Sequence, residues 1–387
     1  MALLADTLIL DATDRFGWVA GRVLADLGGE VIKLDPPATD RSAADWRAFN
    51  VNKRLLDLDA AAADRLEELL ARADICLLTP ATFDLGGRLD PQALRARYPR
   101  LVVVAITPFG SVGPRRAWRG TDIEVMAAGG AMALAGEPDG VPLRVSEPQS
   151  YAWAGAQAAT GALVALYRRE MTGRGDLVDV SAQACVVAAI AHAPAFVDIL
   201  GVEPQRAGAF MTGRSVHGAR YRVFWPCRDG WLNFIFYGGQ AGRRTNEQLV
   251  AWMRERGAEP GPLARIDWLT FDPTTAHQAE VDALEAPVLE FFAQLTKREF
   301  LTQAHRRQML GYPVATVADI AADPQLKARG FFETLAGPGG TSETHCGGFA
   351  VIDGRRPPLR HAGGSPAATP SSPPSPPPTS SRRPASP

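Results

Sequence analysis

The sequence predicts an α/β protein with a doubly wound large domain and a smaller α+β domain. Short apolar runs alternate with helical stretches over the first half of the chain, and an aromatic hairpin pattern follows. Parallel strands need helical crossovers, so this alternation favours a mostly parallel sheet. With 387 residues, 46% of them hydrophobic, the chain can bury the cores of two or three domains.

The chain opens with a βαβ pattern. Residues 7–11 are rich in strand formers, residues 20–29 are small and apolar and end in glycines, and residues 30–34 again suit a strand. Glycine favours the C-terminal end of a helix, which supports a strand–helix–strand assignment. The pattern continues with helices predicted at 61–71 and 91–98 and buried strands at 75–78 and 101–106.

The next segments predict a closely packed alanine-rich helix, then a strand and an apolar helix, and finally aromatic strands. Residues 150–169 form an alanine-rich helix whose small side chains permit close approach to a neighbouring helix. A strand is expected at 177–181 and an apolar helix at 182–200. Residues 218–237 predict two aromatic strands joined by the turn Arg228-Asp229-Gly230.

These patterns predict four segments. Residues 1–200 form the large domain and residues 201–310 the small α+β domain. Residues 311–355 return to the large domain, beginning with a strand-like run at 313–317. Residues 356–387 are rich in proline and serine, and such a composition buries too little apolar surface to offset chain entropy, so we expect a disordered tail. A linker, a partner-binding arm and a frame-altered terminus all fit this composition.

Charge and composition exclude several classes of function. Forty-one basic and 42 acidic residues leave a net charge of −1, so we expect no nucleic-acid or membrane partner. The four cysteines are scattered and the histidines lack metal-ligand spacing, so we expect no bound metal. Without a secretory signal pattern or a long apolar run, the sequence predicts a cytoplasmic protein.

Several short sequence blocks occur in order along the chain, among them Asn52-Lys53-Arg54 and Val178-Asp179-Val180-Ser181. Together they resemble the family III (CaiB/BaiF) CoA-transferases, which include formyl-CoA transferase, carnitine CoA-transferase and α-methylacyl-CoA racemase. The resemblance extends over residues 8–350. The blocks lie at residues 21–33, 52–58, 107–114, 173–181, 221–231 and 323–332.

The resemblance implies two interlocked subunits, each with a Rossmann-like large domain and a small domain, and acyl-CoA bound between them. Acyl-CoA and a carboxylic acid would be substrates, with no permanently bound cofactor. Coenzyme A carries several phosphates, which need local cations in a nearly neutral protein. By position in the family pattern, Arg15, Lys53 and Arg119 are the candidate CoA-binding residues.

The resemblance also reveals a missing catalytic group. Family III transferases use an aspartate nucleophile five residues after the Asp of the Val-Asp-Val-Ser block. Here Asp179 holds the first position and Ala184 the second, and a methyl group cannot attack a thioester. Cys185 is offset by about 100° on a helix, which favours a buried structural thiol. His192 would share the helical face of Ala184, although a core histidine is the simpler interpretation.

Two further positions depart from the family pattern. Thr121 stands where the racemases carry a histidine and cannot shuttle a proton, which disfavours racemisation. Asp122 remains as a weak acid–base candidate, although a loop aspartate is commonly a turn or cap residue. Thr79-Pro80 replaces an Asn-Phe pair of the CoA-binding surface.

Three functions therefore compete. The chain is the Asp-lacking subunit of a benzylsuccinate-type CoA-transferase, paired as a homodimer or with an Asp-bearing family chain. Alternatively, it is an autonomous acyl-CoA lyase, dehydratase or isomerase that uses no aspartyl-CoA intermediate. The third possibility is a non-catalytic CoA-binding scaffold. CoA transfer by the chain on its own would discriminate among them.

Overall fold

The computed structural model describes residues 2–36, 39–57, 62–80, 87–337 and 340–366. The chain forms two compact units. Unit 1 comprises Met1–Ile106, Gly155–Asp179 and Glu333–Pro387, and unit 2 comprises Thr107–Ala154 and Val180–Phe332. This division differs from the predicted boundary at residue 200, because residues 107–154 and 180–200 group with the later part of the chain.

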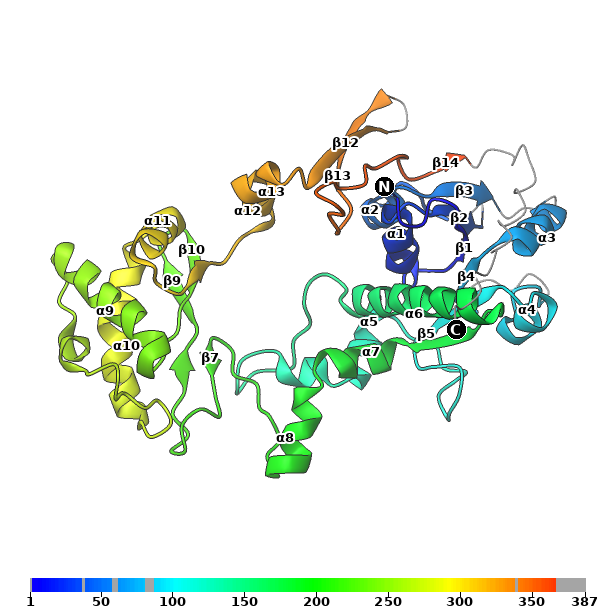
Figure 1. The fold of residues 1–387 in the computed structure, drawn as a ribbon. Coiled ribbons are helices and arrows are strands. Elements are labelled where there is room, and N and C mark those ends of the chain that lie inside the picture. Colours follow the sequence, from blue (N-terminus) through cyan, green and yellow to red (C-terminus); the bar gives the residue numbers. More distant parts are fainter. Residues whose placement is uncertain (1, 37–38, 58–61, 81–86, 338–339, 367–387) are drawn as a thin grey trace, which may run out of the picture. The chain divides into compact units, whose positions relative to one another are not determined.

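Unit 1 is built around a parallel sheet whose described strands number seven (Figure 1). Their order is β14-β3-β2-β1-β4-β5-β6, and the pairs of β1 with β2 and with β4 are both parallel. This contains the 3-2-1-4-5-6 order of doubly wound nucleotide-binding folds. The strands are β1 (Leu8–Ala12), β2 (Glu30–Asp35), β3 (Arg54–Asp57), β4 (Ile75–Leu78), β5 (Val102–Thr107), β6 (Leu177–Ser181) and β14 (Ser365–Pro366).

The predicted strands and helices of unit 1 are confirmed within one to three residues at each end, whereas the helix Ala44–Asn50 and the strands β3 and β14 were not predicted. The positive φ of 105° at Gly28 explains why α1 ends there, since glycine adopts that conformation without strain. The helices are α1 (Trp18–Asp26), α2 (Ala44–Asn50), α3 (Ala62–Arg72), α4 (Pro91–Arg97) and α6 (Ser150–Thr172), the last of which begins in unit 2.

The small residues of α6 allow the close packing that the sequence predicts. A Cβ atom at Gly155 would lie 2.6 Å from the Cβ of Val19 on α1, and one at Gly161 would lie 2.8 Å from Val178. At Gly155 the backbone of α6 therefore approaches the backbone of α1, and at Gly161 it contacts the Val178 side chain. A larger side chain at either glycine would force the elements apart.

The end of the described chain departs from the predicted tail. Residues 356–366 are ordered against unit 1: β14 pairs with β3, and the Arg360 backbone N–H donates to Asn52 Oδ1 at 2.6 Å. The Arg360 guanidinium also donates to the carbonyls of Ala25 and Gly29. Pairing with distant backbone groups orders this segment, and composition does not reveal such pairing. The rest of the predicted tail, 367–387, lies outside the described residues.

Unit 1 also contains the antiparallel hairpin of β12 (Phe332–Ala336) and β13 (Ser342–Cys346). Unit 2 begins with α5 (Asp122–Ala128) and a 3₁₀ turn (Ala131–Leu134), and continues with α7 (Ala182–Ala189) and α8 (His192–Leu200). The helix predicted over 182–200 is therefore broken, and its two halves are bent by 65°. The Pro194 ring is incompatible with a helical carbonyl four residues earlier, at Ile190, where α7 ends.

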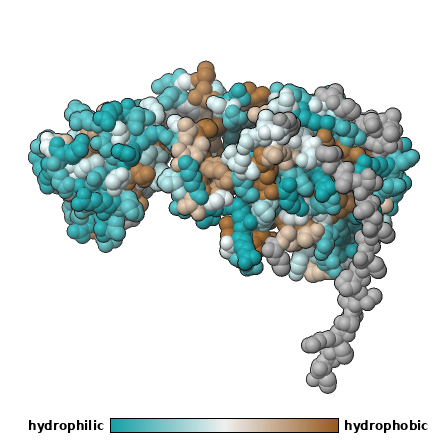
Figure 2. All heavy atoms as spheres, turned by 90° about the horizontal axis from the view of Figure 1, so that it is seen from above, coloured by the Kyte–Doolittle hydropathy of each residue, from teal (hydrophilic) through white to brown (hydrophobic). Residues whose placement is uncertain are grey.

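The predicted small α+β domain forms the second part of unit 2. Helices cover one side of a three-stranded antiparallel sheet (Figure 1), and Trp225, Phe234 and Phe292 meet edge to face in the core. In Figure 2 the surface of this part, at the left, is largely hydrophilic. Its elements are β7 (Phe210–Met211), β8 (Tyr221–Arg222), β9 (Phe224–Cys227), β10 (Gly230–Asn233), β11 (Tyr312–Pro313), α9 (Gly239–Glu255), a 3₁₀ turn (Gly261–Arg265), α10 (Gln278–Ala293), α11 (Lys297–Arg307), α12 (Val317–Ala322) and α13 (Pro324–Ala328).

The aromatic hairpin is confirmed, because Cys227 pairs with Gly230 across the predicted turn. The return to the large domain begins later than predicted. Pro313 pairs with Leu232 of β10, so residues 313–317 belong with the small sheet, and the chain rejoins unit 1 at Glu333. Within the parts of the chain that the structure describes, no single helix has the length and apolar composition to cross a membrane. The bent pair α7–α8 meets that test only when both helices are taken together.

Candidate functional site

The sheet of unit 1 has its topological switch point between β1 and β4. In doubly wound sheets, ligands bind beyond the carboxyl ends of the strands at this point. Here Thr79, just after β4, bridges to the loop after β1: its hydroxyl donates to Asp14 Oδ1 at 3.1 Å and accepts from the Asp14 N–H at 3.2 Å. The Thr79 hydroxyl is therefore buried across the switch point, where the family pattern predicted an Asn-Phe pair.

A buried charge network lies directly beneath this edge. Lys53 Nζ donates to Asp11 Oδ2 at 2.7 Å, to the Trp18 carbonyl at 2.8 Å and to Asn50 Oδ1 at 2.8 Å. Lys33 Nζ lies 3.8 Å from the other oxygen of Asp11. All three protons of the Lys53 ammonium are thus used within the protein. The ammonium joins the end of β1, α1 and the end of α2.

The environment keeps the central pair ionic. Burial would raise the pKa of Asp11, but the neighbouring Lys53 and Lys33 ammonium groups outweigh that effect and hold the pKa below its usual value. Burial lowers the pKa of Lys53 to about 8, although Asp11 opposes the shift. Both groups are charged at neutral pH, so the network is an ion pair in a nearly water-free setting.

The other unit 1 candidate, Arg15, differs from Lys53 in exposure. Its side chain is 55% exposed, pairs with Asp45 at 2.8 Å, and lies 5.8 Å from the ring centre of Trp18. Trp18 also supplies the carbonyl that Lys53 contacts, so the structure brings these two candidates to one loop. Arg15 can present a cation to a ligand, whereas the buried Lys53 ammonium stabilises the backbone at Trp18. Their contact with CoA stays a prediction.

In unit 2, Asp122 is buried at the start of α5 and receives three hydrogen bonds on one oxygen. The N–H groups of Gln149 and Ser150 donate to Oδ1 at 2.9 and 2.8 Å, and the Ser150 hydroxyl donates at 2.8 Å. The Asp122 N–H in turn donates to the Tyr151 hydroxyl at 3.1 Å. The carboxylate therefore caps the N-terminus of α6. This geometry favours a positioning role over proton transfer.

Ala184 lies in the first turn of α7. Its N–H donates to the hydroxyl of Ser181, the N-cap residue, at 3.3 Å, and its methyl group is exposed. The preceding residue, Gln183, is fixed at both ends: its N–H donates to the Pro108 carbonyl at 3.0 Å and its side-chain amide to the Ala128 carbonyl at 2.8 Å. The position is thus rigidly held at a helix N-terminus, where a negative charge is favoured.

The two neighbours considered as substitutes for the missing aspartate have different positions. Cys185 is 2% exposed, and burial raises the pKa of its thiol to about 11, so it is a structural residue and a poor nucleophile. His192 begins α8 beyond the 65° bend, so the expected sharing of a helical face with Ala184 is wrong. Its ring packs edge to face against Phe196.

The loop before α5 carries a basic and aromatic group that the sequence reasoning had only partly identified. Arg119 is exposed there, as are Arg115 and Arg116. Trp118 is 58% exposed; its ring contacts Phe109 edge to face and lies 5.1 Å from the Arg115 guanidinium. The run Gly-Pro-Arg-Arg-Ala-Trp-Arg was the available signal. Together these side chains suit a ligand with phosphates and an aromatic ring.

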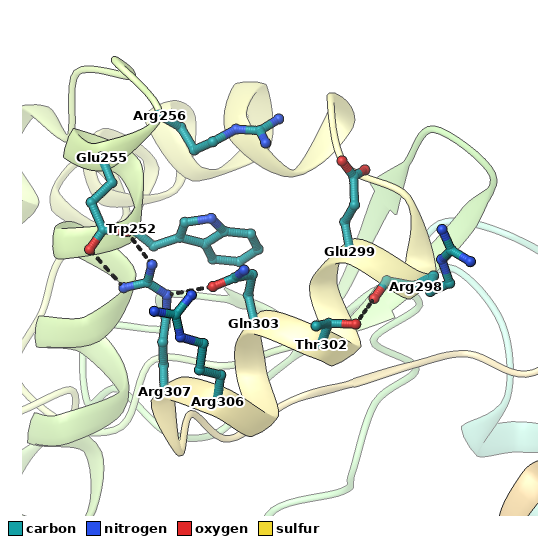
Figure 3. Close-up of a pocket in the computed structure, with 9 residues that line it drawn as sticks. All are labelled: Trp252, Glu255, Arg256, Arg298, Glu299, Thr302, Gln303, Arg306 and Arg307. Carbon is teal, nitrogen blue, oxygen red and sulfur yellow. Dashed lines mark hydrogen bonds and ion pairs between the residues drawn. The ribbon is translucent and has the colours of Figure 1, made fainter.

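A pocket of about 330 Å³ lies elsewhere in unit 2, between the end of α9 and α11 (Figure 3). Arg307 fixes one wall: it donates to Glu255 Oε1 and Gln303 Oε1, each at 3.1 Å, and lies over Trp252. None of the residues predicted for the CoA site lines this pocket. Its lining residues are Trp252, Glu255, Arg256, Arg298, Glu299, Thr302, Gln303, Arg306 and Arg307.

The strand order of the parallel sheet, with its switch point between β1 and β4, defines a doubly wound α/β protein. A crystal structure of a CaiB/BaiF family protein from Brucella suis is similar with a TM-score of 0.76, at 25% identity, covering 94% of this chain and 95% of that one. The structure of Rv3272 from Mycobacterium tuberculosis shares the fold with a TM-score of 0.73, at 22% identity, covering 95% of this chain and 97% of that one.

The chain belongs to CoA-transferase family III, whose profile matches residues 4–368. It is 28% identical to succinyl-CoA:(R)-benzylsuccinate CoA-transferase subunit BbsE of Thauera aromatica, covering 84% of this chain and 82% of BbsE. It is 27% identical to a formyl-CoA:oxalate CoA-transferase of Streptomyces avermitilis, covering 85% and 84%. It is 29% identical to probable CoA-transferase Rv1866 of Mycobacterium tuberculosis, covering 88% of this chain but 43% of that longer protein.

Proposed function

We propose that this chain is the Asp-lacking subunit of a heteromeric CoA-transferase, which moves CoA between an acyl-CoA thioester and a carboxylic acid. Ala184 is the observation that carries the proposal. Ala184 lies exposed in the first turn of α7, where its N–H donates to the Ser181 hydroxyl, yet its side chain is only a methyl group. The fold is therefore preserved around a position that cannot form the aspartyl intermediate of the family.

The family chemistry then needs a second chain. The partner's aspartate carboxylate attacks the donor thioester, forms a mixed anhydride and releases CoA thiolate. The thiolate attacks the aspartyl carbonyl, which gives aspartyl-CoA thioester and frees the donor acid. The acceptor carboxylate repeats these two steps in reverse and leaves as the new acyl-CoA. This chain would contribute cations for the CoA phosphates, with Arg15 and Arg119 exposed and Lys53 holding the loop beneath Arg15.

Two observations support a second family chain as the partner. BbsE is named a subunit, and so is the beta subunit of succinyl-CoA–L-malate CoA-transferase of Chloroflexus aurantiacus, which is 25% identical over 81% of this chain. Apolar side chains are also exposed in both units, which is typical of interaction surfaces. We infer an interlocked pair that buries them. They are Val164, Tyr167 and Met171 on α6 and Phe196, Val197, Ile199 and Leu200 on α8.

An autonomous lyase, dehydratase or isomerase is less well supported. It needs a carboxylate or imidazole free to exchange protons with substrate. Asp122 Oδ1 already accepts three hydrogen bonds at the α6 N-terminus, and His192 packs against Phe196 beyond the bend. The non-catalytic scaffold remains as the third hypothesis, and the experiment below separates it from the first.

The test is CoA transfer from succinyl-CoA by three preparations: this chain, an Asp-bearing chain of the same family from the same organism, and the two expressed together. We expect transfer by the co-expressed pair, with little or none by either chain alone. Transfer by the lone chain would refute the role of an Asp-lacking subunit. A pair that forms but gains nothing over the Asp-bearing chain would favour the scaffold.

A further inference from the structure

The pocket between the end of α9 and α11 holds more positive charge than its own structure uses (Figure 3). Four arginines and two glutamates line it, an excess of two positive charges in a chain whose net charge is −1. Arg307 donates to both carboxylate oxygens of Glu255. Glu299 accepts from the N–H and the hydroxyl of Thr296 at 2.8 and 2.9 Å, which caps α11. The arginines that remain are Arg256, Arg298 and Arg306.

These three arginines are not neutralised within the chain. Among the residues that the structure describes, no carboxylate oxygen lies within 4 Å of their guanidinium groups. Figure 3 shows Arg256 on the α9 side of the pocket and Arg298 and Arg306 on the α11 side. Arginine stays protonated at physiological pH, so three like charges surround a hollow of about 330 Å³. An anion in the hollow would relieve their mutual repulsion.

The spacing along α11 separates the ligand-facing row from the row that builds the wall. Arg298, Thr302 and Arg306 are four residues apart and therefore lie on one face of the helix. The adjacent row is tied internally, since Arg307 donates to Gln303 Oε1 at 3.1 Å. The Thr302 hydroxyl donates to the Arg298 carbonyl at 2.8 Å, so this short side chain leaves the space between the two arginines open.

Arg298 is the cation that helix electrostatics does not explain. Arg256 and Arg306 lie at the C-terminal ends of α9 and α11, where cations complement the helix dipole. Arg298 is the second residue of α11 and lies near the positive end of the dipole, where a cation is unfavourable. A bound anion would offset that unfavourable interaction.

The surface around the pocket is polar. The large apolar side chains of α9 are all buried in the small domain: Leu249, Val250, Trp252 and Met253. Figure 2 shows a largely hydrophilic surface over this domain. The centre of a subunit interface is typically apolar and depleted of charged residues. This face therefore suits a small charged ligand better than a partner chain.

We propose that this pocket binds a small ligand with a chain of linked phosphate groups, an inorganic or organic triphosphate. Guanidinium groups hold phosphate oxygens through paired, charge-assisted hydrogen bonds. The Cα atoms of Arg298 and Arg306 lie about 12 Å apart on an α-helix, so a polyphosphate contacts both side chains while they stay apart. A single phosphate would draw two like charges together. This binding does not depend on the CoA-transferase function proposed above.

The test is calorimetric titration of the full chain with inorganic tripolyphosphate at physiological salt, which screens weak contacts with exposed charges. We expect one ligand per chain, bound at least about tenfold more tightly than orthophosphate. R298Q and R306Q should each weaken binding at least about tenfold, and R298K should retain most of it. ATP is titrated in parallel: tighter binding than tripolyphosphate identifies an organic triphosphate, and weaker binding an inorganic one.

R244Q is the matched control for these variants. It removes an exposed arginine of α9 that lies roughly 18 Å along the helix from Arg256, and it should leave tripolyphosphate binding unchanged. Equal losses in R244Q and R298Q would overturn the proposal, because exposed arginines would then attract the anion without a defined site. An unchanged urea midpoint in each variant separates lost binding from lost folding.

Two other results would also overturn the proposal. Binding that is lost in R15A but kept in R298Q would place tripolyphosphate on the cation predicted for CoA instead of in this pocket. The titration is repeated on the co-expressed pair of chains described above. Loss of the site in that pair would show that a partner subunit covers the pocket.

Discussion

Substituting Ala184 by aspartate tests whether the missing carboxylate is the main defect of this chain. The side chain is exposed in the first turn of α7, and its N–H already meets the N-cap hydroxyl of Ser181. Ser-x-x-Asp is a capping pattern, and an acidic group in a first turn is stabilised by the helix dipole. We expect A184D to raise stability by about 0.3–1 kcal/mol, measured as a higher urea midpoint.

The catalytic expectation for A184D is a gain of function. With succinyl-CoA, the new carboxylate should form a covalent CoA thioester that mass spectrometry locates at residue 184. A184N is the matched control, since its amide has the same shape and caps the helix but cannot form that thioester. We expect CoA transfer by A184D at least about a hundredfold above A184N, which corresponds to about 2.7 kcal/mol in the barrier.

Two results would refute this reasoning. Destabilisation of A184D by more than about 1 kcal/mol would show that the position is not the open, capped site described above. A well-folded A184D without thioester or transfer would show that more than the nucleophile is missing, and attention would move to the CoA-binding residues.

Three further predictions concern the buried charges Lys53, Glu285 and Asp122, with the exposed Arg15 as a comparison. Lys53→Met leaves Asp11 buried without its main partner and should lower the free energy of urea unfolding by about 3 kcal/mol. Arg15→Ala removes an exposed ion pair and should lower it by less than about 1 kcal/mol. Equal losses of stability in the two variants would contradict the assigned burial. Burial raises the pKa of Glu285 from 4.5 to about 7, so the unfolded chain ionises this carboxyl at a lower pH than the folded chain does. The folded chain should therefore lose about 3 kcal/mol of stability as pH rises from 4.5 to 7. The E285Q variant should lack this loss, and parallel pH profiles of stability for the two proteins would refute the prediction. Asp122→Ala should cost about 1–2 kcal/mol through the lost α6 cap, and lost activity of the heteromer at unchanged stability would instead favour an acid–base role.

The break between α7 and α8 shows where a local signal existed and was not used. Residues 182–200 are uniformly apolar and suggested one helix, but Pro194 cannot follow a helical turn that includes the Ile190 carbonyl. The bend moves His192 away from the face of Ala184. The restriction that Pro194 places on the helical backbone therefore argues against His192 as a substitute for the missing aspartate.

Other features had no local signal. From the sequence, the strand at 312–313 could pair with either sheet, because an apolar run does not indicate which strand it pairs with. Residues 356–366 look like the rest of the proline-rich tail, yet Arg360 and β14 find acceptors and donors some 300 residues earlier in the chain. Such long-range pairing depends on the assembled sheet.

Strand periodicity, helix-ending glycines and ordered motifs are local properties, so the doubly wound pattern, the family and the alanine at the expected catalytic position could be predicted from the sequence. The roles of the polar candidates depend instead on contacts in the folded chain. Folding buries Lys53 on Asp11, places Asp122 beneath the start of α6, and leaves Arg15, Arg119 and Ala184 exposed. A charged side chain is a ligand-binding group or an internal partner according to its burial and its neighbours, and both follow from contacts between residues far apart in the chain.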